Sequence, residues 1–343
     1  MWLRSDNAAG VDPDILQAMV SCNNGIAMPY GDDGLSRQLD SRFSEVFGKS
    51  VRAFAVPSGT AANALALSSA AGPFDLVICH QNAHVFANEC GAAEFYSAGA
   101  RFAPVPGVHG RIETAAVAEL LGALDLSRGN AFRPAVLTVT QATEAGTVYQ
   151  PEALRALGEL ARQHGLRFHM DGARFANAVT FLDVEPADLS WRAGIDVLSF
   201  GATKNGTMYA DAVVFFNQSL AEDFKRRLKR SGHDLSKARF LAAQLLRYLE
   251  DDLWLHNARR ANAAARELAD LLSRVPEASI LHPVEGNIVF AALPGAAVHA
   301  LENGGIRLRS KGRLPDGRES FRLVPSFLTE LAEVRALAPI LKL

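Results

Sequence analysis

A lysine follows an apolar run in the segment DVLSFGATKNG, residues 196–206. Residues 197–200 have the composition of a buried strand, and Lys204 comes next among small and polar residues. A strand that simply reaches solvent can end in such a lysine. A lysine at the mouth of a sheet can also be desolvated beside a ligand, where its amine becomes nucleophilic. This segment alone leaves both interpretations open.

The segment VPSGTAAN, residues 56–63, has the features of a phosphate site. It places Ser58, Gly59 and Thr60 at the start of a predicted helix. Backbone N–H groups at a helix N-terminus point outward at the positive end of the helix dipole, and the two hydroxyls add donors. The same residues would also make an ordinary N-cap, so both interpretations stand at this point.

Two further polar residues follow predicted strands. Asp171 ends an apolar strand in HMDGAR, where a carboxylate can keep a heteroaromatic ring nitrogen protonated or can cap the next turn. His84, in NAHVFANE, puts a flat ring on the loop after the strand LVIC. With Lys204 and the phosphate segment, they supply the amine, carboxylate, phosphate site and flat ring that pyridoxal phosphate requires. The ordered set predicts a pyridoxal phosphate enzyme in which Lys204 bonds to the cofactor aldehyde.

The elements that must position these residues alternate along the chain. Apolar strand-like runs alternate with helical patterns up to Asn217, and PEALRALGELARQHG predicts a helix from Pro151 that stops at Gly165. This alternation favours a mostly parallel sheet covered on both faces, with ligands beyond the carboxyl ends of its strands. Long charged helices and the short strands NIVFAAL, IRLRSK and SFRLVPSF follow, which is typical of a small α+β domain. The first 30 residues predict an arm with one helix, outside both cores.

The motifs of this chain resemble those of the low-specificity L-threonine aldolases, within the aspartate-aminotransferase-like (fold type I) pyridoxal phosphate enzymes. The resemblance runs nearly end to end, through LRSDNAAG, YGDD, PSGTAANALAL, NAHVFANECGAA, HMDGARFANA, SFGATKNG and SFRLVPSF. It implies an α/β fold with a mostly parallel seven-stranded sheet domain and a smaller C-terminal α+β domain. The implied divisions are an arm at 1–30, a large cofactor-binding domain at 31–245 and a small domain at 246–343.

The resemblance also implies roles for individual residues. It implies three catalytic residues: Lys204 bonds to the cofactor, Asp171 pairs with the pyridine nitrogen, and His84 stacks on the ring. The cofactor-binding set is Ser58, Gly59, Thr60, His84, Asp171, Arg174, Lys204 and Lys237. The substrate-binding set is Ser5, Arg174 and Arg322, which hold the carboxylate, and Tyr30 near the subunit interface.

Two positions depart from the family pattern. Many members carry a second active-site histidine in the loop that reads TQATEAG here, where this chain has Thr143 or Glu144, so the general base stays open. Many also have a phosphate-contacting arginine where HDLSKAR stands, and Lys237 is expected to replace it as a point charge. Two neighbouring residues have simpler interpretations. His169 is expected to be buried and hydrogen-bonded, and Glu89 either orients His84 or caps a helix.

The predicted reaction is retro-aldol cleavage of L-threonine, L-allo-threonine and related L-β-hydroxy-α-amino acids to glycine and an aldehyde. Another fold type I enzyme, a β-eliminating lyase or an aminotransferase acting on a small amino acid, would share every cofactor residue. A nucleotide-binding oxidoreductase is disfavoured because no G-x-G-x-x-G follows a strand. A non-catalytic binding module on an enzyme fold is a further alternative.

Composition sets the remaining expectations. The 343 residues are 49% hydrophobic, which is enough to form a large core. The formal net charge of -2 gives no reason to expect nucleic acid or an anionic membrane as a binding partner. No segment has the pattern of a signal peptide or a membrane span. Three cysteines without metal-type spacing predict reduced thiols in a cytoplasmic protein, and no metal site. The resemblance implies a homotetramer, a dimer of dimers with active sites at the dimer interface.

Overall fold

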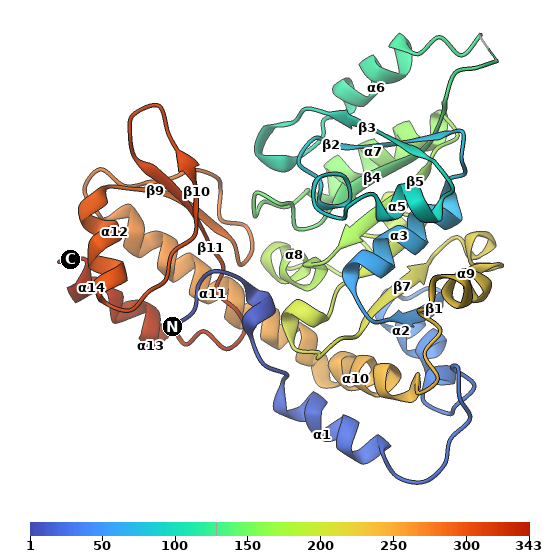
Figure 1. Cartoon of the computed structure of the whole chain (residues 1–343), viewed down its shortest axis with the longest axis horizontal. Helices are drawn as coiled ribbons and strands as arrows, with labels where there is room; N and C mark the ends of the chain where they lie inside the picture. The colour runs from blue at the N-terminus through green and yellow to red at the C-terminus, as the bar shows by residue number, and fades with distance from the viewer. Residues whose placement is uncertain (128) are drawn as a thin grey trace.

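A seven-stranded sheet organises the larger of two layered units in the computed structural model, which describes residues 1–127 and 129–343 (Figure 1). The strand order is β1-β7-β6-β5-β4-β2-β3, and β7 alone runs antiparallel to its neighbours. The predicted mostly parallel seven-stranded sheet is therefore confirmed. The strands are β1 (Arg52–Val56), β2 (Asp75–His80), β3 (Arg101–Val105), β4 (Arg133–Thr140), β5 (Arg167–Gly172), β6 (Val197–Phe200) and β7 (Asp211–Phe215).

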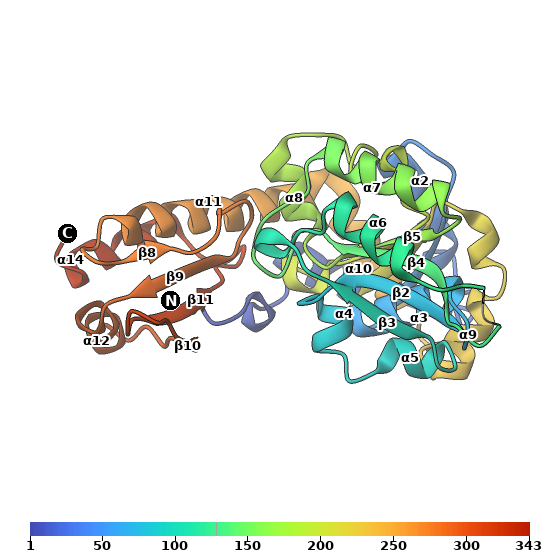
Figure 2. The same cartoon turned by 90° about the horizontal axis from the view of Figure 1, so that it is seen from above.

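Helices cover both faces of this sheet (Figure 2). One face carries α2 (Leu39–Phe47), α6 (Thr114–Ala123), α7 (Pro151–Gln163) and α8 (Phe175–Leu182). The other carries α3 (Gly59–Ala70), α4 (His84–Ala87), α5 (Ala92–Tyr96) and α9 (Phe224–Ser231). Helix α7 begins at Pro151, as predicted, and buries Leu154 and Leu157. Its apolar residues recur every three to four positions, which places them on one face against the sheet.

Gly158 marks a close approach of α7 to the turn Trp191–Ala193. A Cβ at this position would lie 2.1 Å from the carbonyl oxygen of Ala193, a backbone atom that cannot move aside cheaply. We expect Gly158→Ala to lower the free energy of unfolding by about 1–3 kcal/mol. Urea denaturation measures this. The matched control is Gly122→Ala on α6, where a Cβ meets nothing within 4 Å. Equal midpoints for the two variants would contradict the packing argument.

The smaller unit is a four-stranded antiparallel sheet in the order β10-β11-β9-β8, backed by helices. Its strands are β8 (Ser279–Ile280), β9 (Val289–Leu293), β10 (Ser310–Arg313) and β11 (Glu319–Leu323). Its helices are α11 (Leu253–Ser273), α12 (Gly295–Asn303), α13 (Leu331–Arg335) and α14 (Leu337–Ile340). The strand expected from IRLRSK begins only at Ser310, because Ile306 packs into the core outside the ladder, and β8 was not anticipated.

Helix α11 connects the two units. It contributes Trp254 and Ala258 to the core of the larger unit and its later residues to the core of the smaller one. Helix α10 (Arg239–Leu249) precedes it and packs beside α1 (Pro13–Cys22). The division of the chain at residue 245 stays a prediction.

The expectation that the first 30 residues lie outside both cores was wrong. Leu3 is 2% exposed in the core of the smaller unit, and its carbonyl accepts a 2.7 Å hydrogen bond from the N–H of Val324. Ile15 on α1 is fully buried in the core of the larger unit. Single apolar residues give no periodic pattern, so the sequence held no signal for these contacts. Figure 1 shows the N-terminus beside the smaller unit.

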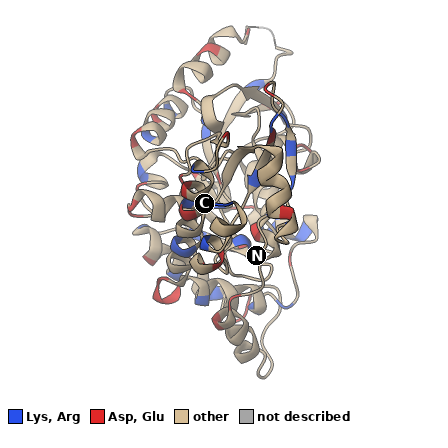
Figure 3. Cartoon of the chain, turned by 90° about the vertical axis from the view of Figure 1, so that its left-hand side faces the viewer, with Lys and Arg blue, Asp and Glu red and all other residues tan. Residues whose placement is uncertain are grey.

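Charged residues are spread over the surface. Figure 3 shows basic and acidic residues interspersed on the face that it presents, in keeping with the formal net charge of -2. Within the described ranges, none of the helices combines the length and the apolar character needed to cross a bilayer.

Candidate active site

Polar residues far apart in sequence gather at the carboxyl edge of the seven-stranded sheet. His84 follows β2, Glu144 follows β4, Asp171 lies near the end of β5, and Lys204 follows β6. Parallel strands end at a common edge, and ligands of open α/β sheets bind there. The strand order therefore brings these four side chains into one neighbourhood.

Asp171 is held in place by an amide. It is 2% exposed; its Oδ1 accepts from the N–H of Ala173 at 3.0 Å, and its Oδ2 accepts from Asn63 Nδ2 at 2.9 Å. Asn63 Nδ2 also donates to Glu89 Oε1 at 2.8 Å. Asn63 thus joins the strand-end carboxylate to a second buried carboxylate, and fixes the orientation of both.

His84 is oriented by Glu89. Its Nδ1 lies 2.8 Å from Glu89 Oε1, and the Glu89 side chain is fully buried. This hydrogen bond raises the pKa of His84, although burial opposes it. Of the two interpretations of Glu89, the structure therefore selects the one in which it orients His84. The other ring nitrogen of His84, Nε2, makes no hydrogen bond with the described residues and can interact with a ligand.

Lys204 lies in a short turn, Thr203–Asn205, that Asp211 holds. Asp211 accepts from the N–H groups of Ala202 and Thr203 at 2.7 and 3.0 Å, and from the Thr203 hydroxyl at 3.2 Å. Burial, and then the positive charge of Arg174, lower the pKa of Lys204, against the carboxylates of Asp6, Asp171 and Asp211. A lowered pKa increases the fraction of neutral, nucleophilic amine.

The segment predicted to bind phosphate caps α3. Ser58 is the N-cap, and its Oγ accepts from the N–H of Ala61 at 3.2 Å. Among the described residues no hydrogen bond engages the N–H groups of Gly59 and Thr60 or the exposed Thr60 hydroxyl. These free donors at a helix N-terminus suit an anion.

Tyr30 and Lys237 lie together elsewhere on the surface. Both are exposed, and the N–H of Tyr30 donates to the carbonyl of Ser236 at 3.2 Å. The ring of Tyr30 faces Lys229, with Nζ 4.1 Å from the ring centroid. Over residues 1–127 and 129–343, no hydrogen bond or ion pair links either residue to Lys204 or Asp171.

Arg174 already has a carboxylate partner. Its Nε and Nη2 form a fork with the two oxygens of Asp6 at 2.8 and 2.9 Å. Asn287 donates to Asp6 Oδ2 at 3.0 Å, and Ser5 caps the short helix that begins at Asp6. Burial acts to raise the pKa of Asp6, but the charge and hydrogen bonds of Arg174 outweigh it and lower that pKa. Much of the positive charge of Arg174 is therefore compensated within the chain.

Arg322 has no such partner. It lies on β11, and burial, followed by the charge of Arg174, lowers its pKa to about 10. No hydrogen bond or ion pair reaches its guanidinium from any residue that the structure describes. A largely desolvated guanidinium that no described carboxylate contacts directly presents a rigid fork to a carboxylate ligand.

Several residues of the neighbourhood have structural partners. Thr143 is fully buried, and its hydroxyl pairs with Thr147 Oγ1 at 2.8 Å. His169 is buried as predicted, with hydroxyls of Thr138 and Ser199 at 2.7 and 3.0 Å from its two ring nitrogens. Burial lowers the pKa of His169 to about 4, so it is neutral at pH 7. Of Thr143 and Glu144, only Glu144 contacts the residues of the candidate site.

The residues present fit pyridoxal phosphate. Lys204 offers an amine of lowered pKa, and Asp171 is a carboxylate oriented toward the same edge. The N–H groups of Gly59 and Thr60 receive no acceptor from the described residues, and among them a Cβ on Gly59 would meet only Asp211 Oδ2, at 3.9 Å. His84 supplies a ring whose orientation Glu89 fixes. Each requirement of the cofactor has a matching group.

Comparison with known proteins agrees with this arrangement. The model of the beta-eliminating lyase family matches residues 3–294. A low specificity L-threonine aldolase of Pseudomonas aeruginosa is 42% identical over 334 residues, covering 97% of this chain and 95% of that protein. A second one, from Pseudomonas sp., has the same identity and coverage. The chain belongs to the low-specificity L-threonine aldolase family.

Solved structures place this threonine aldolase family member in its fold. A threonine aldolase of Leishmania major has a TM-score of 0.92 and 25% identity, covering 99% of this chain and 98% of that one. A structure of SPT with PLP, at 17% identity and a TM-score of 0.72, covers all of this chain and 86% of the other, and shares the fold. The predicted family and fold class are confirmed, whereas the roles of individual site residues stay predictions.

Three residues of this threonine aldolase family member escaped the sequence reasoning. Asn63 is a lone amide on the otherwise small and apolar helix α3, which is a signal that could have been used. Asp211 is a carboxylate at the start of the apolar strand β7, and because β7 runs antiparallel to β6, this start lies at the same edge of the sheet as the end of β5. Asp6 carries no local signal, because its partner Arg174 lies 168 residues away.

Proposed function

We propose that the protein cleaves L-threonine, L-allo-threonine and related L-β-hydroxy-α-amino acids to glycine and an aldehyde, with pyridoxal phosphate as cofactor. The observation that carries the proposal is Arg322, a largely desolvated guanidinium that no carboxylate of the described residues contacts, in the electrostatic neighbourhood of Arg174 and Asp6. An α-amino acid brings the carboxylate that this site lacks. The two Pseudomonas relatives, both low specificity L-threonine aldolases, support the choice of reaction.

The chain's own residues supply what the cofactor needs. When bound, pyridoxal phosphate supplies an aldehyde that bonds to amines and a ring that accepts the electron pair released at Cα. Lys204 offers the amine, and Asp171 offers a fixed negative oxygen to the ring nitrogen. The proposed phosphate ligands are Ser58, Gly59, Thr60 and Lys237, and His84 is the proposed partner of the ring face.

The grip on the substrate decides which bond breaks. The guanidinium of Arg322 would hold the substrate carboxylate, and the cofactor would hold the substrate amino group. With both groups fixed, the substrate can adopt only one orientation about its N–Cα bond. We propose that this orientation exposes Cα–Cβ rather than Cα–H to cleavage. The assay compares products from L-threonine. Glycine and acetaldehyde support the aldolase, whereas ammonia and a 2-oxo acid would support a β-eliminating lyase or an aminotransferase instead.

We propose further that the protein is a cytoplasmic homotetramer, a dimer of dimers whose active sites lie at the dimer interface. Tyr30 and Lys237 support this, because both are expected site residues that lie exposed and make no hydrogen bond or ion pair with Lys204 among the described residues. A neighbouring subunit would bring them to a second site. Sedimentation velocity tests the assembly, and a monomer at assay concentration would contradict it.

The two arginines are expected to respond differently to substitution. Arg322→Lys replaces a fork by a point charge, so we expect the KM for L-threonine to rise and kcat to fall, by about 1.5–3 kcal/mol in kcat/KM. The melting temperature is expected to change little, because the Arg322 guanidinium makes no hydrogen bond or ion pair with any described residue. Arg174→Lys breaks the fork with buried Asp6 and is expected to lower the melting temperature as well.

Exposed Arg309 provides the matched control, since its charge acts on Arg322 and it makes no hydrogen bond or ion pair in the described part of the chain. Arg309→Lys is expected to leave KM and kcat close to wild type. Threonine amide, which lacks the carboxylate, is expected to be a poor substrate for the wild-type enzyme. If threonine and its amide gave equal kcat/KM, the assignment of Arg322 to the carboxylate would be wrong.

A further inference from the structure

Glu144 is a buried carboxylate at the candidate site with one oxygen engaged and one free. Its Oε1 accepts from the backbone N–H of His84 at 2.7 Å and from Thr140 Oγ1 at 2.9 Å. Its Oε2 is enclosed, and no donor from the described residues reaches it. An enclosed carboxylate oxygen without a donor is costly to keep charged, and it is a ready acceptor for a proton.

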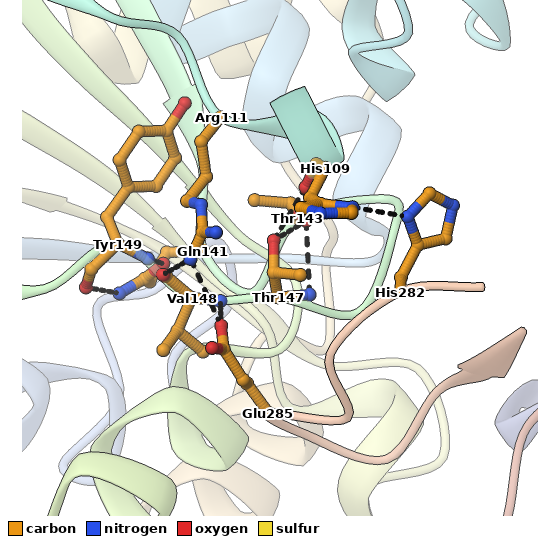
Figure 4. Close-up of polar contacts among 9 residues, drawn as sticks. All are labelled: His109, Arg111, Gln141, Thr143, Thr147, Val148, Tyr149, His282 and Glu285. Atoms are coloured by element: carbon orange, nitrogen blue, oxygen red, sulfur yellow. Dashed lines mark hydrogen bonds and ion pairs between the residues drawn. The ribbon is translucent and has the colours of Figure 1, made fainter. Parts of the chain in front are cut away.

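The loop that carries Glu144 is fixed from both units (Figure 4). The N–H of Thr143 donates to the carbonyl of Thr147 at 2.8 Å within the loop. From the smaller unit, Glu285 Oε2 accepts from the N–H of Val148 at 2.8 Å and pairs with Arg111 at 3.3 Å. Glu144 therefore has a set position between the sheet edge and the unit that carries Arg322, as a preorganised catalytic group requires.

The charges around Glu144 come from several elements. Burial, and then the negative charge of Asp171 on β5, raise the pKa of Glu144 to about 7. The other titratable groups within electrostatic reach are His84 on α4, Cys79 on β2, Tyr149 in the same loop and Arg322 on β11. The charged, basic form thus increases as pH rises through about 7, near the pH at which a general base works best.

His84 is the competing candidate for the base. Its Nδ1 contacts buried Glu89, and this contact raises the pKa of His84 and favours the protonated ring. The Nδ1 side of the ring is already engaged by Glu89, whereas Glu144 offers an enclosed oxygen that no donor among the described residues reaches. The free oxygen of Glu144 is the better acceptor in this neighbourhood.

We propose that Glu144 is the catalytic base that takes the proton of the substrate β-hydroxyl, an inference that rests on the proposed aldolase function. The O–H bond breaks and its proton bonds to Oε2. The electron pair left on oxygen becomes the carbonyl bond of the aldehyde as Cα–Cβ breaks. The pair of that bond stays with the glycine fragment, which takes up one proton at Cα. The sum is threonine to glycine and acetaldehyde, with no co-reactant.

Glu144→Gln tests the proposal, since the amide oxygen can still accept from His84 and Thr140 but cannot take the proton. We expect kcat on L-threonine to fall by about 10²–10⁴-fold, with little change in KM. Glycine has no β-hydroxyl, so exchange of its Cα hydrogen with D₂O, followed by NMR, is expected to continue at close to the wild-type rate. This contrast separates a base for the hydroxyl from general damage to the site.

Glu94→Gln is the matched control. Glu94 lies on α5, and its Oε2 is also enclosed and receives no hydrogen bond from the described residues, but the residues around it are mostly apolar, among them Leu67, Val77 and Phe102. The kcat of Glu94→Gln on L-threonine is expected to match that of the wild-type enzyme. If Glu144→Gln folds poorly, Glu144→Asp serves instead: it shortens the reach, so kcat falls while the pH dependence of a carboxylate base remains.

Two pH measurements complete the test. Wild-type kcat is expected to fall as pH drops through about 7. The kcat of Glu144→Gln is expected not to show this decrease, which is the acid limb of the pH profile. In the cofactor-free protein, infrared spectroscopy is expected to show a protonated carboxyl band that disappears over the same range and is absent from Glu144→Gln. A Glu144→Gln enzyme with wild-type kcat and an unchanged acid limb would overturn the proposal. A wild-type enzyme that does not cleave threonine would instead overturn the proposed function.

Discussion

Lys204→Ala is expected to abolish threonine cleavage, with a loss on the order of 10⁴-fold or more, or about 5.4 kcal/mol of transition-state stabilisation. Lys204 is a half-buried amine whose pKa is lowered by desolvation and then by the charge of Arg174, and the carboxylates of Asp6, Asp171 and Asp211 are its other electrostatic neighbours. The turn that carries it is held by backbone bonds to Asp211, which alanine preserves. The variant should therefore fold and lack only the nucleophile.

The measurement combines turnover with covalent labelling. Borohydride treatment of wild-type enzyme with pyridoxal phosphate is expected to leave the cofactor attached to the peptide that contains Lys204, as seen by mass spectrometry. Lys204→Ala should give no adduct at that peptide. Lys342→Ala, at an exposed lysine near the C-terminus, is the control and should keep the adduct. A variant without Lys204 that retained both an adduct and near wild-type turnover would assign the nucleophile elsewhere.

Asp171→Asn is expected to keep the cofactor but to lose on the order of 10³-fold in kcat, or about 4 kcal/mol. Asparagine still accepts from the N–H of Ala173 through its amide oxygen, so the turn is preserved. It carries no negative charge, so it cannot keep the ring nitrogen protonated, and stabilisation of the charge released at Cα is lost. Steady-state kinetics and the absorbance of the bound cofactor measure the two effects separately.

Asp196→Asn is the matched control for this substitution. Asp196 also accepts from a backbone N–H, that of Phe168 at 2.9 Å, but it precedes β6 and lies at the opposite edge of the sheet. We expect its kcat to stay close to wild type. A loss of less than about tenfold, or 1.4 kcal/mol, in Asp171→Asn would mean that Asp171 serves only as a turn cap.

The sequence by itself determined the elements and the groups at their ends. Lys204, Asp171 and the Ser58 segment were found because each directly follows an apolar run, and a strand end is a local feature. Helix α7 was found because its apolar period and its Pro151 start are also local. Such signals are carried by neighbouring residues, so no knowledge of the fold is needed to detect them.

Only the tertiary structure decided how these groups are paired. The fork between Arg174 and Asp6 joins residues 168 positions apart, and it leaves Arg322 rather than Arg174 as the uncompensated guanidinium. The grip of Glu285 on the loop of Glu144 joins the two units across 137 positions. Such contacts follow from the order β1-β7-β6-β5-β4-β2-β3 and from the docking of the smaller unit. Periodicity encodes which face of an element is buried, but not which distant side chain it meets there.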